Sequence, residues 1–262
     1  MKEMKTEQIQ TQKSKKQKPF FRFIKSVAKI GYKKRKHLGL ENIPEEPSII
    51  VGNHTHLFGP LYAEMYFPYK RYTWCIGHML HLKEAPPYVF EDFWGHKPKK
   101  THWWYKFWAK ILSPLMVYIN KNAYTIGVYK DARGISTFKN SVKALKDNNH
   151  IIIFPEKHEE FNHVVNEFQD KFVDLARFYY KETGKEISFV PMYNAHELKT
   201  VVYGKPIKFD VNKDITEQRK EICEYLKKEI TTLAEGLPRH KVVPYANIKK
   251  KNYPYSKEKQ SD

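Results

Sequence analysis

The sequence predicts an α/β fold, in which a layered sheet with flanking helices is preceded by an N-terminal amphipathic helix. Short apolar runs typical of buried strands alternate with longer segments in which apolar residues recur at helical spacing. Strands separated by helices favour such a layered sheet. A chain of 262 residues is long enough for one full-sized domain with a core, and short for two independent domains plus tails.

The predicted strands are short and mostly apolar. They are residues 48–52, 71–77, 124–128, 150–154, 187–192 and 201–203. The run 150–154 has the strongest buried-strand pattern and ends at Pro155, which has no N–H to donate to a ladder. The predicted helices between and after these strands are residues 61–66, 135–147, 168–181 and 216–233.

The N-terminal part of the chain divides in two. Residues 1–18 are polar and rich in Lys and Gln, which predicts a disordered basic tail. Residues 19–37 follow as an amphipathic helix, with Phe20, Phe23 and Val27 on one face and basic residues around it. This pattern favours a helix lying in a membrane interface. The alternative is an ordinary surface helix packed on the domain core.

An aromatic and basic segment occupies residues 79–108. It contains Phe, Trp and His side chains interleaved with lysines, together with Pro86 and Pro87. Three interpretations stay open: a cover over an active site, a second membrane contact, or a packing layer.

The charge balance is strongly basic, because 47 Lys and Arg stand against 29 Asp and Glu, giving a net charge of +18. Such a chain attracts polyanions: acidic lipid, phosphate-bearing ligands or nucleic acid. No nucleic-acid-binding signature accompanies the charge, so nucleic acid is not an expected partner. Cys75 and Cys223 are the two cysteines, so no disulfide framework is expected and a reducing compartment is favoured.

Targeting signals are equally sparse. The polar N-terminal residues lack the apolar core of a signal peptide, and no window approaches the roughly 18 apolar residues that span a bilayer. The expected location is therefore peripheral, on the cytoplasmic face of a membrane, without a transmembrane helix.

Three short segments carry the chemistry. They are Asn-His-Thr-His-Leu-Phe-Gly-Pro at 53–60, Phe-Pro-Glu-Lys-His at 154–158, and Val-Pro-Met at 190–192 followed by Gly-Lys-Pro-Ile at 204–207. In this order and spacing they resemble the glycerolipid acyltransferase family, which includes the 1-acylglycerol-3-phosphate and other lysophospholipid acyltransferases. The resemblance covers roughly residues 38–235. It implies an acyltransferase-like domain over 38–248, with a basic tail over 249–262.

The chain departs from the family pattern at the acid of the catalytic pair. The family has an Asp five residues after the His, and this chain has Gly59 there. The candidates for a replacement are Glu64, Asp92, Asp131, Glu156 and Glu159, while His56 could share the work of His54. The residues after Phe-Pro-Glu also differ from the family's Gly-Thr-Arg.

The resemblance implies a role for each matching residue. His54 takes the proton of an acceptor hydroxyl, as a histidine can near neutral pH. Asn53 helps to set the turn, and Lys130 with Glu156 holds the acceptor headgroup. Lys157 or His158 stands in for the second family Arg, so phosphate would meet a point charge instead of a bidentate fork.

The expected function is transfer of a fatty acyl group to a lysophospholipid or glycerol-phosphate-type acceptor at a membrane surface, as in phospholipid biosynthesis. The donor is an acyl thioester, either acyl-CoA or acyl carrier protein, and the expected partners are this donor, the acceptor and anionic membrane lipids. No bound cofactor and no metal site are expected, because the 12 histidines show no ligand spacing. The alternative is a catalytically weakened lipid-binding relative.

Overall fold

The computed structural model describes residues 17–158, 163–245 and 248–258 of the chain. Most of the predicted basic tail at 1–18, and Glu159, lie outside these ranges. The predictions made for these residues therefore lie outside the described structure.

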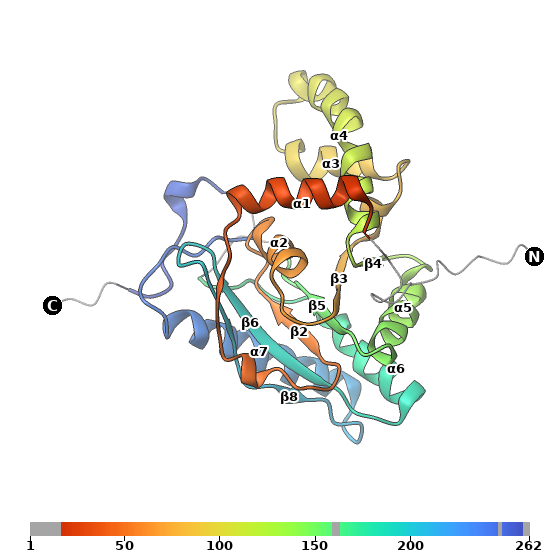
Figure 1. Cartoon of the computed structure of the whole chain (residues 1–262), viewed down its shortest axis with the longest axis vertical. Coiled ribbons are helices and arrows are strands. Elements are labelled where there is room, and N and C mark those ends of the chain that lie inside the picture. Colours follow the sequence, from red (N-terminus) through yellow and green to blue (C-terminus); the bar gives the residue numbers. More distant parts are fainter. Residues whose placement is uncertain (1–16, 159–162, 246–247, 259–262) are drawn as a thin grey trace, which may run out of the picture.

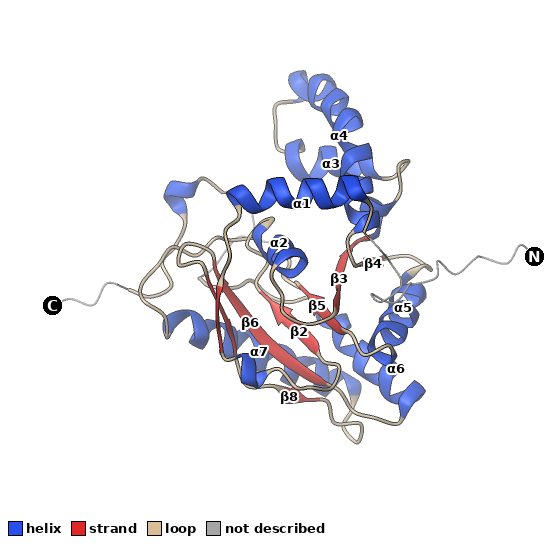
Figure 2. Ribbon diagram, in the orientation of Figure 1, coloured by secondary structure: helices blue, strands red, loops and turns tan. Residues whose placement is uncertain are grey.

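A single mixed sheet forms the centre of the described structure (Figure 2). Its strands are β1 (Lys36–Leu38), β2 (Ile49–Gly52), β3 (Arg71–Ile76), β4 (Thr125–Val128), β5 (His150–Ile153), β6 (Ser188–Ala195), β7 (Thr200–Tyr203) and β8 (Ile207–Lys208). The order is β1-β7-β6-β2-β5-β3-β4, with β8 pairing antiparallel to β6. The strands β6, β2, β5, β3 and β4 are parallel, so their carboxyl ends share one edge of the sheet.

Helices cover both faces of this sheet, as Figure 1 shows. The helices of the described structure are α1 (Pro19–Gly31), α2 (Phe58–Met65), α3 (Ala85–Trp94), α4 (His102–Asn122), α5 (Gly134–Lys146), α6 (Asp174–Thr183) and α7 (Ile215–Glu235), of which α3 and α4 form a pair beside the sheet. Strand β2 is buried on both faces: Ile49 and Val51 join the core formed with α5, α6 and α7, while Ile50 joins the core formed with α2. The α/β layered architecture predicted from the sequence is therefore confirmed.

Each predicted strand overlaps an observed strand, but several boundaries differ. Strand β6 continues to Ala195, and the very short β1 and β8 were not predicted. The helix predicted over 168–181 begins as a 3₁₀ turn, and α6 starts only at Asp174. The helix predicted over 19–37 ends at Gly31, because the chain then turns to form β1 beside β7.

The C-terminal segment also differs from the predicted basic tail beginning at residue 249. Val242 N donates to Pro254 O at 2.9 Å, and Ser256 N donates to His240 O at 2.9 Å. The side chain of Ser256 is fully buried. Main-chain hydrogen bonds thus hold this segment on the domain as far as Ser256, although its sequence is basic and polar.

The aromatic insertion forms a helical pair. Helices α3 and α4 stand together at one end of the molecule (Figure 1) and share a small core that includes Met79, Val89, Phe90 and Ala109. No described helix has the length and apolarity needed to cross a membrane.

Candidate active site

His54 lies at the carboxyl end of β2, in the middle of the sheet. Because β2 pairs in parallel with β5, with Val51 opposite Ile153, the segment after β5 begins beside His54. The first two sequence motifs therefore meet at the edge where ligands bind in open parallel sheets.

The orientation of the His54 ring is set by the main chain of its own loop. His54 Nδ1 lies 2.5 Å from the carbonyl oxygen of His56. Since a carbonyl oxygen only accepts, Nδ1 carries the proton and Nε2 keeps its lone pair. This is the tautomer that a general base requires.

An unusual backbone makes this contact possible. Thr55 and His56 both adopt left-handed conformations, with φ of 47° and 51°. Left-handed backbone is rare for a β-branched residue such as Thr, and strain of this kind costs about 1–3 kcal/mol. The two successive left-handed residues turn the His56 carbonyl back toward the His54 ring. His56 therefore contributes its main-chain carbonyl group to the site. No sequence pattern predicts this contact.

No described carboxylate is hydrogen-bonded to the His54 ring. Glu64 is paired with Arg71 at 2.6 Å and with Lys25 at 2.7 Å. Asp131 is paired with Arg133 at 2.8 Å. The acid expected beside the histidine is replaced, in the described part of the chain, by a neutral carbonyl.

Glu156 contacts His54 through the main chain. Its buried carboxylate accepts from His54 N at 2.6 Å and from Asn166 N at 3.0 Å. Burial raises the pKa of this carboxyl to about 7, against the opposing effect of the two amide donors. Both oxygens are thus engaged by the chain itself, whereas the sequence led us to expect Glu156 at the acceptor headgroup.

Asn53 fastens the same loop to the neighbouring strand. Its Oδ1 accepts from Asn194 N at 2.7 Å, and its Nδ2 donates to Asn194 O at 3.4 Å. Asn194 Nδ2 also reaches Thr55 Oγ1 at 3.4 Å. These contacts identify Asn194 as a support of the loop that the sequence did not indicate. Asn166 is another, because its N–H donates to Glu156.

Gly59 sits where the loop enters α2, and a side chain there has no room. A Cβ at this position would lie 2.6 Å from the carbonyl oxygen of His54 and 2.9 Å from the Phe154 ring. Gly59 N donates to that same oxygen at 3.1 Å. The close packing of this loop therefore requires glycine at position 59.

Aromatic side chains enclose the His54 ring. Tyr245, from the C-terminal segment, stacks on it with ring centroids 4.2 Å apart, and Phe154 meets it edge-on at 5.5 Å. Burial, with smaller contributions from the nearby His56 and His158 rings, lowers the pKa of His54 to about 4. His54 is therefore uncharged at neutral pH.

Tyr245 also connects His54 to two residues singled out from the sequence. The ring of His158 meets it edge-on at 5.3 Å. Asp92, on α3, interacts electrostatically with both Tyr245 and His158, and burial raises the pKa of its carboxyl. Of the acids proposed as replacements, Asp92 thus comes near this group from the aromatic insertion. No pattern in the sequence indicated Tyr245, which lies far from His54 along the chain.

Removing the Tyr245 ring is expected to raise the pKa of His54 toward its ordinary value of 6.5. The Tyr245→Ala variant exposes one face of the imidazole to water, which stabilises its charged form. Tyr245→Phe keeps the stacking and should leave the pKa near that of the unaltered protein. Titration of the His54 ring by NMR measures both, and equal pKa values in the alanine and phenylalanine variants would contradict this cause.

The basic residues expected at the substrate phosphates are exposed. Lys157 and His158 follow β5, next to the His54 loop. Lys130 follows β4, three strands away from β2, so about 14 Å of sheet separates their ends. The structure thus brings Lys157 and His158 near His54 and puts Lys130 further along the same edge.

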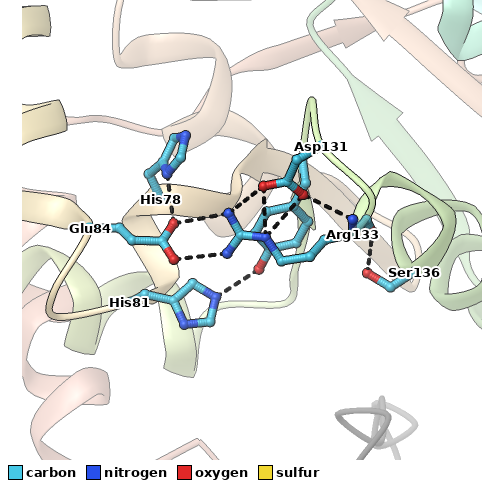
Figure 3. A network of polar contacts seen from close by, with 7 residues as sticks. His78, His81, Glu84, Asp131, Arg133 and Ser136 are labelled. Atoms are coloured by element: carbon cyan, nitrogen blue, oxygen red, sulfur yellow. Dashed lines mark hydrogen bonds and ion pairs between the residues drawn. The ribbon is translucent and has the colours of Figure 1, made fainter. Parts of the chain in front are cut away.

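Beside Lys130, a network of polar side chains joins the segments after β3 and β4 (Figure 3). Arg133 donates to Glu84 at 2.8 Å and to Asp131 at 2.8 Å, while His78 lies 2.7 Å from Glu84. Hydrogen bonds from Arg133 lower the pKa of Asp131 to about 2. The guanidinium of Arg133 is therefore engaged by two carboxylates. Within the described ranges, no three His, Cys, Asp or Glu side chains gather as a metal-binding group.

No protein-family model and no curated protein matches the chain. Among solved structures, it is similar to the crystal structure of the 1-acyl-sn-glycerophosphate (LPA) acyltransferase PlsC from Thermotoga maritima. The two are 17% identical, with a TM-score of 0.44, over 81% of this chain and 79% of that one.

Proposed function

We propose that this protein is an acyltransferase that moves a fatty acyl group from an acyl thioester to the hydroxyl of a lysophospholipid or glycerol-phosphate-type acceptor. The observation that carries the proposal is the His54 ring, held at the carboxyl edge of the sheet with Nδ1 tied to a carbonyl and Nε2 unprotonated. This arrangement suits proton abstraction from an alcohol.

The proposed reaction uses this geometry. His54 Nε2 takes the hydroxyl proton while the acceptor oxygen bonds to the thioester carbonyl carbon. The resulting tetrahedral intermediate expels the thiolate as the C–S bond breaks. The imidazolium returns its proton to the thiolate, so an ester and a free thiol leave the site. The His56 carbonyl keeps its hydrogen bond to Nδ1–H throughout, but offers only a partial charge to the imidazolium where a carboxylate would offer a full one.

The charges around the site support phosphate-bearing substrates. Lys157 and His158 are exposed next to the His54 loop, and Lys130 is exposed at the same edge. The face of α1 supports work at a membrane: Phe20, Phe23 and Val27 are 55%, 63% and 50% exposed. An apolar helix face with surrounding lysines suits the boundary between headgroups and acyl chains.

The test is thiol release from acyl-CoA, or from acyl carrier protein, with anionic liposomes and a panel of lysophospholipids. The His54→Ala variant is expected to lose at least about 10³-fold in rate, because the substitution removes the imidazole that accepts the hydroxyl proton. Since the proton must be absent from Nε2, protonation of His54 should abolish activity only as pH falls through about 4.

A second function competes with this one: a lipid-binding relative without turnover. The neutral carbonyl in place of an acid and the aromatic cover on His54 favour it. Under this alternative, acyl-CoA or lysophospholipid binds equally well to the unaltered protein and to His54→Ala, and no donor releases thiol above the variant's background.

A further inference from the structure

Helix α4 presents two opposite faces. At four-residue spacing, Tyr105, Ala109, Ser113 and Val117 form the row that packs into the insertion, and Ala109, Ser113 and Val117 are buried. The other side is covered by two neighbouring rows of exposed apolar side chains. These are Trp103, Phe107, Ile111 and Leu115, and Trp104, Trp108 and Leu112. The exposed fractions reach 71% for Trp103 and 52% for Phe107.

This apolar face is embedded in an exclusively basic segment. Between Asp92 and Asp131 the chain has no acidic residue, and its charged side chains are Lys97, Lys99, Lys100, Lys106, Lys110, Lys121 and Lys130. Lys106 and Lys110 are exposed in the row that adjoins Trp103 and Phe107. A face of this charge does not complement a second copy of itself. It complements an anionic surface that also accepts apolar side chains.

The choice of side chains identifies that surface as lipid. Tryptophans prefer the membrane–water interface, because the ring is largely apolar and its N–H reaches polar headgroups. Lysines can place their alkyl stems along the apolar layer and their ammonium groups among anionic headgroups. Exposed patches of this kind on one helix mark sites of interaction.

The apolar surface of α4 continues onto α1. The ring of Tyr118 lies 5.5 Å from that of Phe20, and Lys18 Nζ lies 5.8 Å from the centroid of the same tyrosine ring. By helical spacing, Tyr118 follows Ile111 and Leu115 on the exposed side of α4. Figure 1 shows the N-terminal end of α1 meeting the helical pair there. Phe20 thereby links the two exposed faces.

We propose that α4 is a membrane-docking helix that inserts Trp103, Trp104, Phe107 and Trp108 into the headgroup region of an anionic bilayer. This assigns the aromatic insertion to the second of the three interpretations left open by its sequence. It does not depend on acyl transfer, because the docking is measured as binding in the absence of any substrate.

The tryptophans of α4 make the proposal directly measurable. The chain has five tryptophans, three of them in α4. Trp74 is hydrogen-bonded to Ser141 at 2.8 Å, and Trp94 is stacked on Tyr105. Vesicles of phosphatidylcholine with phosphatidylglycerol, some carrying brominated acyl chains, should blue-shift and quench the fluorescence of the purified protein. Pure phosphatidylcholine and high salt should weaken the binding.

A matched pair of variants isolates α4 while keeping all five tryptophans. Phe107→Ser with Ile111→Ser removes two side chains of the exposed face. Tyr69→Ser with Ile135→Ser removes an aromatic and an isoleucine of similar exposure, 44% and 59%, elsewhere on the surface. The α4 variant is expected to lose at least about tenfold in vesicle partitioning, and the control to stay within about twofold. Circular dichroism and thermal unfolding verify that both remain folded.

Three results would overturn the proposal. In the first, the protein sediments with vesicles but brominated lipid does not quench its fluorescence. Another surface of the protein would then bind the membrane. The second is an equal loss in the two variants. The third is a dimer in the absence of vesicles that the α4 variant abolishes, combined with no vesicle binding, which would make the face a contact between copies of this chain.

Discussion

The Gly59→Asp variant, which places an acid where the glycerolipid acyltransferase pattern has one, is expected to unfold more easily by about 3 kcal/mol and to gain no activity. The new Cβ would lie 2.6 Å from the main-chain oxygen of His54, and neither this oxygen nor the backbone behind it can move freely. Overpacking of this kind costs about 1–3 kcal/mol, and burying a carboxylate without a partner adds to it.

The Gly59→Ala variant separates these two causes. It adds only the Cβ, so it is expected to cost about 1–2 kcal/mol. Urea unfolding of the three proteins at pH 7 measures the differences, and the thioester-release assay measures the activity. A Gly59→Asp protein that is as stable as the unaltered one and transfers acyl groups faster would show that this loop has room for a carboxylate and that the His56 carbonyl is dispensable.

Much of the fold was predictable from the sequence, because the central strands are signalled by continuous apolar runs. Strands β2 and β5 are buried on both faces. Burial on both faces favours a continuous run of apolar residues, which can be recognised without knowing the neighbouring strands. Strand β1 has only the three residues Lys36–Leu38 and a polar sequence, and it exists because β7 offers a pairing edge. Pairing with a distant segment leaves no local signal.

The same contrast separates the parts of the site. His54 and its place after a buried strand were predicted from a contiguous motif. Phe154 belongs to the second motif, but its contact with the His54 ring was not predicted. The orienting carbonyl of His56 was missed, because it depends on left-handed backbone at two residues that are not glycine. Tyr245 was missed because its contact with His54 is made by a remote segment near the C-terminus that carries no recognisable motif.

Replacing Glu156 by Gln is expected to remove a pH dependence from the stability of this protein. The carboxyl is about 2% exposed, and burial raises its pKa in the folded protein to about 7, above its ordinary 4.5. Between pH 4.5 and 7 the folded state therefore holds a proton that the unfolded chain has released. The free energy of unfolding contributed by Glu156 is then fully present below pH 4.5 and is lost as pH rises through 7. The loss amounts to about 3 kcal/mol.

The glutamine side chain of the Glu156→Gln variant cannot ionise. The free energy of unfolding of this variant therefore does not fall as pH rises through 7. At pH 5 its amide leaves one of the two main-chain donors, His54 N or Asn166 N, without an acceptor, at a cost of about 1–3 kcal/mol. At pH 8 the unaltered protein bears a buried charge that the variant avoids. The stability difference between the two should therefore shrink or change sign from pH 5 to 8. The exposed Glu46→Gln change serves as control and should show no such trend.

Denaturant unfolding at half-unit steps from pH 4.5 to 8 measures all three proteins. The His54 amide is one of the two donors, so the same ionisation acts on the loop that holds the catalytic ring. If the charge on Glu156 strengthens this anchor, acyl transfer by the unaltered protein should rise as pH increases through 7, and transfer by Glu156→Gln should not. A parallel pH dependence of stability in the two proteins would instead mean that Glu156 is ionised throughout, held so by its two amide donors.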